Sequence, residues 1–246
     1  MNRGGTMEKP LVSILIPTYN RVSFFIKALE SAVSQTYENI EIIICDNSDN
    51  KDTKMAVKDY LVKYKMITYI KNDKNLKYLG NMNKCLSLAK GEYVNFLLDD
   101  DLFSPIKIET MINYMLLDEE INLVSSPFYF INENDAILGI NESILRREEN
   151  YIASGRYIIN EMLGNISNCI GVPTTVLFRK SALNYEFGKY KEFEFVFASD
   201  MALWLDLFIK GKVYLFKSTL KLLSYPSRSK DCCGRKRMGQ MHARFF

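Results

Sequence analysis

The first part of the chain alternates short apolar runs with amphipathic segments. Leu11–Ile16 and Glu41–Cys45 are mostly branched and apolar, as is typical of strands buried on both faces of a parallel sheet. Arg21–Gln35 instead carries apolar residues at helical spacing. The alternation continues with a helix near 52–64, a strand near 66–71, a helix over Gly80–Lys90 that Gly91 ends, and a strand over Tyr93–Leu98. This order predicts an α/β fold with a mostly parallel sheet and right-handed crossovers.

The pattern after residue 103 is less regular. Ser104-Pro105 predicts a helix start, with serine at the cap and proline in the first turn. Strand patterns lie near 121–130 and 174–179, and the segment between them has no clear period. Asp200–Lys210 predicts an apolar-faced helix, and Lys212–Tyr225 predicts two short strands.

Charge is distributed unevenly along the 246 residues. The net charge is only +3, which does not favour a nucleic-acid partner. The last segment, 226–246, has six Lys or Arg residues against one Asp, so we treat it as a basic tail. Residues 1–10 are polar, contain two adjacent glycines and are expected to form a flexible leader. The length between these ends suits one large domain.

Several functional classes are disfavoured by what the sequence lacks. It has no apolar run of about 18 residues for a membrane span and no apolar N-terminal signal. A single histidine, His242, argues against a serine–histidine–aspartate triad. No glycine-rich phosphate loop is present, which argues against nicotinamide enzymes and P-loop nucleotidases. The cysteines have no CxxC pair and indicate reduced thiols in a cytoplasmic protein: Cys45, Cys85, Cys169, Cys232 and Cys233.

Three loops carry the candidate chemistry, because ligands of such sheets bind beyond the carboxyl ends of the strands. The loops are Pro17–Asn20, Asp46–Asn50 and Asp99–Asp101. Three adjacent carboxylates repel one another and would be relieved by Mg²⁺ or Mn²⁺ shared with substrate phosphates. A solvated acidic loop with an aspartate capping the next helix is the alternative. Asp46 could accept the ring N–H of a uracil-like base, or could simply form an Asx turn.

An ordered set of segments resembles the family 2 glycosyltransferases and covers about residues 11–225. The matching segments are 12–21 (VSILIPTYNR), 41–48 (EIIICDNS), 80–85 (GNMNKC) leading through 89–101 (AKGEYVNFLLDDD), 171–179 (GVPTTVLFR) and 199–207 (SDMALWLDL). The resemblance implies the GT-A fold, a Rossmann-like, mostly parallel twisted sheet flanked by helices, with a small mixed or antiparallel acceptor-side region. Residues 11–117 would form the nucleotide-sugar-binding half and 118–225 the acceptor-side half.

The resemblance also implies roles for individual residues. Asp200 would be the catalytic base, although an aspartate there could equally serve a helix N-terminus. Asp100 and Asp101 would hold Mn²⁺ or Mg²⁺. The nucleotide would be contacted by Pro17, Thr18, Tyr19, Asp46, Asn83 and Asp99.

Two positions depart from the family pattern. Leu98 stands where the family often has the first aspartate of Asp-x-Asp-Asp, and Arg228 lies in the stretch where many members have a histidine. Arg228, like Arg21, could contact phosphate. The Gln-x-x-Arg-Trp motif of processive members is absent, which disfavours a polymer-extruding synthase.

The resemblance implies an inverting, non-processive transfer of a sugar from a nucleotide-diphosphate sugar, with UDP favoured, to an acceptor hydroxyl. The expected setting is surface polysaccharide or glycoconjugate assembly on a glycan or lipid-linked acceptor. The basic tail could touch anionic lipid at the inner face of the membrane. The alternatives are a non-catalytic nucleotide-sugar-binding or scaffold protein and a sugar-nucleotide nucleotidyltransferase. Asp200→Asn should abolish turnover only in a transferase.

Overall fold

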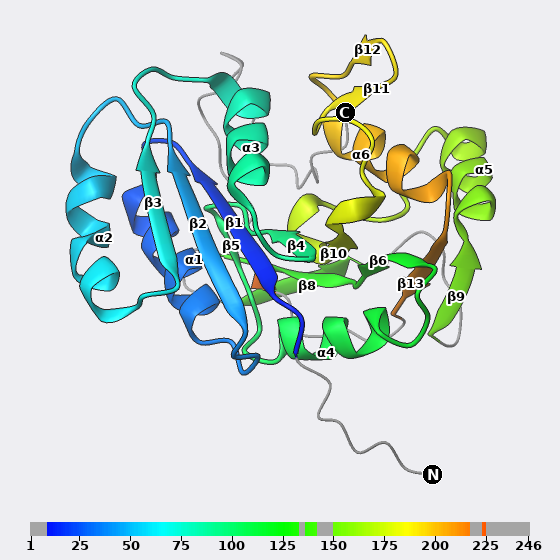
Figure 1. Ribbon diagram of the computed structural model, residues 1–246, viewed down its shortest axis with the longest axis horizontal. Coiled ribbons are helices and arrows are strands. Elements are labelled where there is room, and N and C mark those ends of the chain that lie inside the picture. The colour runs from blue at the N-terminus through cyan, green and yellow to red at the C-terminus, as the bar shows by residue number, and fades with distance from the viewer. Residues whose placement is uncertain (1–8, 133–135, 142–149, 217–222, 225–246) are drawn as a thin grey trace.

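A twisted eight-stranded sheet forms the centre of the molecule. The computed structural model describes residues 9–132, 136–141, 150–216 and 223–224 (Figure 1). In spatial order the strands are β3 (Ile67–Lys71), β2 (Ile40–Asp46), β1 (Val12–Thr18), β4 (Tyr93–Phe96), β10 (Val176–Arg179), β6 (Ile121–Ser125), β13 (Lys212–Leu215) and β9 (Tyr151–Ser154). The first four strands are parallel, whereas β10 runs antiparallel to both of its neighbours. The predicted mostly parallel α/β fold is therefore confirmed.

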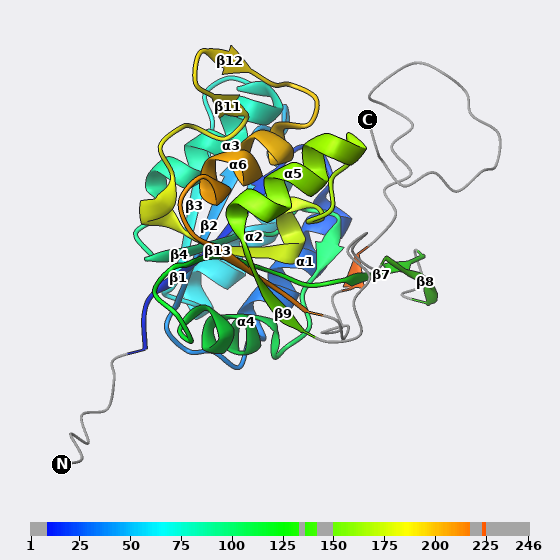
Figure 2. The ribbon, with the colours of Figure 1, turned by 90° about the vertical axis from the view of Figure 1, so that its right-hand side faces the viewer.

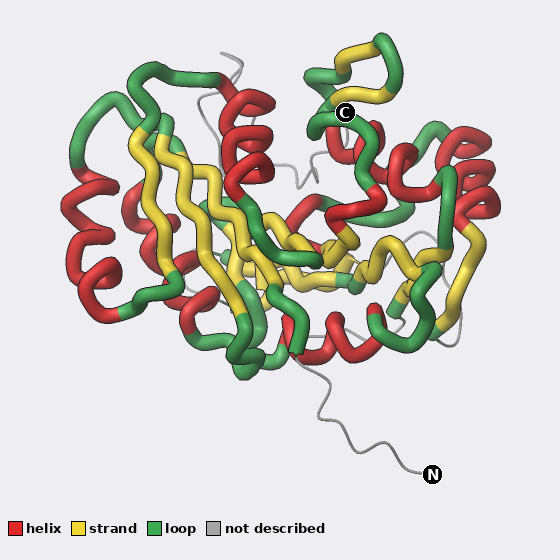
Figure 3. Tube along the Cα trace, viewed as in Figure 1, coloured by secondary structure: helices red, strands yellow, loops and turns green. Residues whose placement is uncertain are grey.

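Helices cover both faces of this sheet (Figure 3). One face packs against α1 (Val22–Val33), α2 (Asp52–Lys63) and α4 (Lys107–Met115). The other packs against α3 (Lys77–Leu88), α5 (Gly155–Asn165) and α6 (Ser199–Phe208). In β1, Ile14 and Ile16 face the first layer and Leu15 faces the second, and all three are fully buried. This burial on both sides explains the continuous apolar runs of the sequence.

Smaller sheets flank the central one. A four-stranded sheet has the order β5 (Asp101–Leu102), β14 (Leu223–Ser224), β7 (Phe128–Ile131) and β8 (Ile137–Asn141), and β7 and β8 lie to one side of the main body (Figure 2). A short hairpin, β11 (Lys189–Tyr190) and β12 (Phe193–Glu194), precedes α6. The first of these sheets matters for the site, because β5 contains the last of the three adjacent aspartates.

Two local predictions about helix ends are wrong. Helix α4 begins at Lys107, without a side-chain cap of its own. Ser104 instead forms a turn in which its carbonyl accepts from Lys107 N, and Gln35 Oε1 accepts from Ile108 N at 3.0 Å. Gly91 is not a left-handed helix cap. A Cβ at Gly91 would lie 2.6 Å from Ser13 Oγ, so glycine permits close approach to β1.

Two further boundaries differ from the sequence pattern. Helix α3 starts at Lys77 rather than Gly80. The apolar stretch at 121–130 is two strands, β6 and β7, which belong to different sheets. The break at Ser126 and Pro127 lets the chain leave the central sheet and enter the smaller one.

Candidate active site

The loops after β1, β2 and β4 meet at one edge of the sheet. Thr18 and Asp46 are direct partners in the parallel register of β1 and β2. The backbone N–H of Asn47 then donates to the carbonyl of Thr18 at 2.9 Å. Thr18 Oγ1 in turn donates to Asp99 Oδ2 at 2.8 Å, across 81 residues of sequence. These contacts place the acidic loop beside the loops that the sequence analysis selected.

Asp99 is the most firmly held of the three adjacent aspartates. Besides Thr18, its Oδ2 accepts from the backbone N–H of Tyr19 at 3.3 Å, and Arg21 Nη1 lies 3.6 Å from its Oδ1. Burial is the main cause that raises the pKa of Asp99 to about 6, and the neighbouring carboxylate of Asp100 adds to it. The carboxyl group of Asp99 is therefore poised to change charge just below neutral pH.

Asp100 is paired with Arg21. Its Oδ2 lies 2.9 Å from Arg21 Nη1, and the guanidinium thus neutralises charge shared between two adjacent carboxylates. The Asp100 side chain is 12% exposed. The other carboxylate oxygen of Asp100 has no hydrogen bond or ion pair within the described part of the chain.

Asp101 belongs to a buried network of hydrogen bonds. Thr174 Oγ1 donates to Asp101 Oδ2 and also accepts from the backbone N–H of Leu98 at 3.2 Å. Asn95 Nδ2 donates to the Thr174 carbonyl at 3.1 Å, and Lys107 Nζ donates to Asn95 Oδ1. Burial holds the pKa of Lys107 well below its usual range. This hydrogen-bond network holds the acidic loop against β4, α4 and the segment before β10.

The acidic loop fits a divalent ion that the substrate helps to bind. No group of three or more His, Cys, Asp or Glu side chains forms a preformed metal site among the residues that the structure describes. Mg²⁺ and Mn²⁺ are, however, commonly held by one or two carboxylates with phosphate oxygens completing the shell. The carboxylate oxygen of Asp100 that Arg21 does not contact suits that arrangement. A metal role for Asp101, whose Oδ2 accepts from Thr174, stays a prediction.

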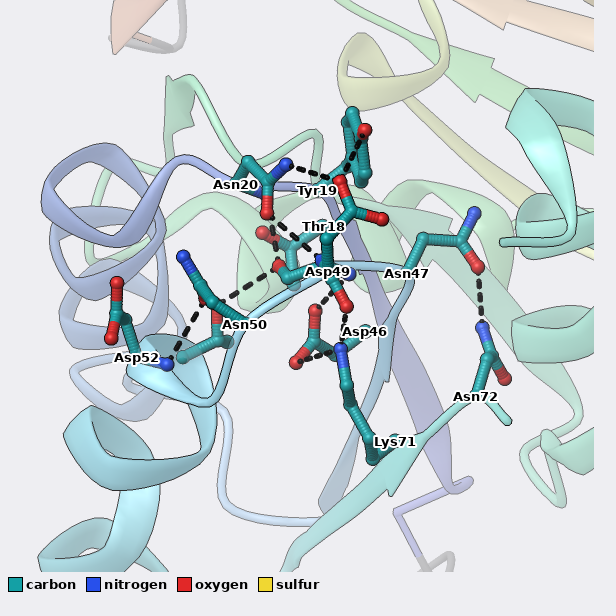
Figure 4. A network of polar contacts seen from close by, with 12 residues as sticks. Thr18, Tyr19, Asn20, Asp46, Asn47, Asp49, Asn50, Asp52, Lys71 and Asn72 are labelled. Carbon is teal, nitrogen blue, oxygen red and sulfur yellow. Dashed lines mark hydrogen bonds and ion pairs between the residues drawn. The ribbon is translucent and has the colours of Figure 1, made fainter. Parts of the chain in front are cut away.

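Asp46 lies at the base of the same edge and is fully buried (Figure 4). Its Oδ2 accepts from Tyr69 Oη at 2.7 Å and lies 3.4 Å from Lys71 Nζ, while its Oδ1 accepts from Ser48 N at 2.7 Å. Burial, followed by the hydrogen bond to Asp46, raises the pKa of Tyr69. The Asx turn that the sequence offered as one alternative is present, since Asp46 accepts from Ser48 N. The other alternative, contact of Asp46 with a nucleotide base, would require Tyr69 or Lys71 to move and stays a prediction.

Tyr19 and Asn20 connect the loop after β1 to the loop after β2 through hydrogen bonds. Tyr19 Oη donates to Asp49 Oδ2 at 2.8 Å, and Asn20 Nδ2 donates to the same oxygen at 3.0 Å. Asn20 has a φ of 53°, a left-handed conformation that asparagine tolerates better than most residues. Tyr19 is 44% exposed and available to a ligand, whereas Pro17 is buried within β1.

Amide side chains connect β2 to α3. Asn72 Nδ2 donates to the side-chain oxygens of Asn47 and Asn81, each at 2.8 Å. Asn83 makes a reciprocal pair with the backbone of Phe187, donating at 3.0 Å and accepting at 2.7 Å. Asn83 therefore joins α3 to the segment before β11, and its expected contact with the diphosphate stays a prediction.

Asp200 lies in the first turn of α6, away from the acidic loop in sequence but linked to it by the segment 168–175. Its Oδ2 accepts from Asn168 Nδ2 at 2.7 Å, and its Oδ1 accepts from Met201 N at 2.8 Å. Thr174, at the other end of the segment, holds Asp101. Burial raises the pKa of Asp200, which brings a carboxylate closer to the basicity that a general base needs near neutral pH.

Sequence reasoning did not select Asn168 or Thr174. Asn168 lies in a stretch without a clear period and Thr174 at the start of a predicted strand, and their partners are 32 and 73 residues away. The only local signal was Gly171-Val-Pro within a matching segment, which marks a turn but not its contacts. Arg228 lies outside the described residues.

The fold and site define an α/β protein with an acidic loop at the carboxyl edge of the parallel strands. The family model for glycosyl transferase family 2 matches residues 13–187. The chain belongs to this family. It is 35% identical over 201 residues to the Escherichia coli enzyme named UDP-Glc:alpha-D-GlcNAc-diphosphoundecaprenol beta-1,3-glucosyltransferase WfaP, covering 82% of this chain and 71% of that protein.

Other relatives extend the comparison. An uncharacterized glycosyltransferase of Methanocaldococcus jannaschii, MJ1057, is 39% identical over 136 residues, and the match spans 54% of this chain but only 47% of that protein. The S. aureus TarS structure in complex with UDP has a TM-score of 0.66 at 17% identity, over 87% of this chain and 60% of that one. At this identity the likeness shows the fold alone. Among the described residues, no helix combines the length and apolarity needed to cross a bilayer.

Proposed function

We propose that the protein transfers a sugar from a UDP-sugar to an acceptor hydroxyl with inversion at the anomeric carbon and with a divalent metal ion. The observation that carries this proposal is the segment 168–175, which contacts the acidic loop through Thr174 and the Asp200 carboxylate through Asn168. One segment thus links a site suited to a diphosphate with a site suited to a base. Membership of glycosyl transferase family 2 supports the same reaction class.

The proposed chemistry is a single displacement. The acceptor oxygen forms a bond to the anomeric carbon as the bond from that carbon to the diphosphate breaks, and the nucleoside diphosphate leaves. Asp200 takes the acceptor proton, a role suited to a carboxylate whose pKa is raised by burial. Mn²⁺ or Mg²⁺, when bound, supplies charge neutralisation for the leaving diphosphate. Asp100 would hold the ion, with Asp101 as a second candidate, and Arg21 would turn toward phosphate once the ion shares Asp100.

The donor and the acceptor are proposed from chemistry and from relatives. WfaP and a second E. coli enzyme, WfgD, both carry UDP-Glc in their names, and TarS has been crystallised with UDP and UDP-GlcNAc. A solved structure of a mannosyltransferase of Pyrobaculum calidifontis is in complex with GDP-Man and Mn²⁺, so a GDP-sugar is the competing donor. The diphosphoundecaprenol in the E. coli names supports a lipid-linked acceptor in polysaccharide synthesis, reached from the membrane surface.

Calorimetric titration of UDP, GDP and dTDP, each with and without Mn²⁺, tests the donor site. We expect UDP to bind only with the metal and expect Asp100→Asn to abolish that binding. Asp52→Asn is the matched control, because Asp52 is exposed in the first turn of α2. UDP binding without metal, or unchanged binding in Asp100→Asn, would contradict the metal–diphosphate site.

A sugar-transfer assay tests the proposed role of Asp200 as the base. With the UDP-sugar that the binding data select and a diphosphoprenol-linked GlcNAc acceptor, Asp200→Asn should lower kcat by at least about 100-fold, the usual range for loss of a general base. UDP affinity should be unchanged. A non-catalytic binding protein would show no turnover even in the wild type.

A further inference from the structure

Asn168 uses its whole side-chain amide to connect a tight turn with Asp200. Its Nδ2 donates to Asp200 Oδ2 at 2.7 Å and to the Gly171 carbonyl at 2.9 Å. Its Oδ1 accepts from the backbone N–H groups of Ile170 and Gly171, at 3.1 and 3.0 Å. Three of the four contacts fix the amide to its own turn. The fourth contact therefore directs the Nδ2 donor of a fixed amide toward the Asp200 carboxylate.

The turn that holds Asn168 is itself rigid. Gly171 has a φ of +116°, and a Cβ there would lie 2.6 Å from Thr175 Oγ1, so other residues would strain the turn. Ser125 Oγ, at the end of β6, donates to the Ile170 carbonyl at 2.6 Å and ties the turn to the central sheet. Ile170 is 2% exposed. The orientation of the Asn168 amide is thus set by the sheet rather than by Asp200.

The environment of Asp200 explains why an amide donor matters there. Burial raises the pKa of Asp200, while hydrogen bonds from Met201 N, from its own backbone N–H and from Asn168 lower it. No charged side chain of the described residues forms a hydrogen bond or ion pair with the Asp200 carboxylate. The Asn168 amide is the only side chain of the described residues that donates to this carboxylate, and the hydrogen bond favours the ionised form.

We infer that Asn168 is the positioning residue that fixes the rotamer of the Asp200 carboxylate and keeps it ionised for proton abstraction. The inference rests on the proposed function, since it assigns a partner to the proposed base. Aspartate at position 168 would keep the acceptor for the turn but replace the donor with a second carboxylate. The Asn168→Asp variant therefore tests the hydrogen bond to Asp200 separately from the hydrogen bonds that hold the turn.

The direct test is a carboxyl ¹³C NMR titration of the full chain, labelled at aspartate Cγ, from pH 4.5 to 8.5. Asp200→Asn identifies the resonance of Asp200. In Asn168→Ala the pKa of Asp200 should rise by about one pH unit, a tenfold loss of ionised fraction on the acid side. In Asn168→Asp it should rise further, because two carboxylates then share one site. Asn165→Ala, which removes an exposed amide at the end of α5, should leave it unchanged.

The outcomes distinguish the inference from the proposed function. If both Asn168 variants fold, as their thermal unfolding shows, and the pKa of Asp200 does not move, Asn168 only builds the turn and the inference is wrong. In the transfer assay the acid limb of the kcat profile should move to higher pH with the NMR value, while UDP affinity stays constant. If the pKa moves but Asp200→Asn transfers sugar at the wild-type rate, Asn168 tunes the carboxylate and the proposed base is wrong.

Discussion

At the scale of single residues, the three adjacent aspartates differ sharply in their surroundings. Asp99 accepts neutral donors and is only loosely paired with Arg21, whereas Asp100 has a close guanidinium partner. Asp101 is held by a threonine hydroxyl. Burying each of these carboxylates lowers the stability of the fold unless opposite charge and hydrogen bonds compensate. At Asp99 burial outweighs these contacts, and the pKa of its carboxyl is raised to about 6.

We predict that Asp99→Asn makes the fold more stable at pH 7. A carboxyl whose pKa rises from 3.8 to about 6 on folding favours the folded state below pH 3.8, and that contribution is lost as the pH rises through about 6. The variant has no such group, so its advantage over the wild type should grow between pH 4.5 and pH 7 by on the order of 2 kcal/mol. Urea unfolding at several pH values measures it. An advantage independent of pH would contradict the assignment.

At the scale of secondary-structure elements, α5 packs on α6, the helix that contains Asp200, through one close contact. Gly155, the first residue of α5, lies against the C-terminal end of α6, and a Cβ there would come 2.1 Å from the carbonyl oxygen of Phe208. Gly155 N also donates to the Gly211 carbonyl at 2.9 Å. Because the three atoms nearest to this Cβ are all backbone atoms of Phe208, no side-chain rotation could relieve a clash. The crossing of α5 over α6 therefore depends on glycine.

We predict opposite effects for two alanine substitutions in α5. Gly155→Ala should destabilise the fold by about 2–4 kcal/mol, because overpacking here must displace α6. Gly164→Ala, at an exposed position with nothing within 4 Å of its added Cβ, should stabilise it by about 0.5–1 kcal/mol through helix propensity. Denaturant unfolding compares them directly. Equal effects of the two variants would refute the packing argument.

The elements also show which features a sequence can reveal. Strands β1, β2 and β4 were predictable because burial on both faces leaves an uninterrupted apolar run. Helix α5 was missed, since it starts at a glycine directly after strand β9, with no loop between them to mark its start. The α4 start was misplaced because its first turn is capped from the segment after α1, through Gln35. The loops of the site could be selected from strand ends, but contacts such as Asn168 with Asp200 depend on tertiary packing.

At the scale of the whole molecule, the acidic loop depends on a segment near the other end of the chain. Strand β5, which contains Asp101, pairs with β14, where Asp101 is opposite Ser224 and Leu102 opposite Leu223. Strand β14 also pairs with β7, so it is an inner strand of the smaller sheet. Removal of β14 would leave β5 without its partner in that sheet.

We predict that a chain ending at Phe216 folds its central sheet but binds UDP with Mn²⁺ at least about tenfold more weakly, because Asp101 loses its strand partner. A chain ending at Tyr225 keeps β14 and should bind normally if the basic tail makes no phosphate contact. Calorimetry on both chains and on Arg228→Ala separates the contribution of the strand from that of the tail. Wild-type affinity in the chain ending at Phe216 would contradict the role of β14.

The antiparallel strand β10 also constrains how the protein can be made by the ribosome. Strand β10 lies between β4 and β6 in the central sheet, so the edge of β4 stays unpaired until residues 97–175 have been synthesised. At about 5–20 residues per second this takes roughly 4–16 seconds, far longer than a hairpin needs to form. A nascent chain with β1–β4 already paired therefore exposes a strand edge for seconds. Such an edge is a template for aggregation and for chaperones, and slow codons before residue 175 would prolong its exposure.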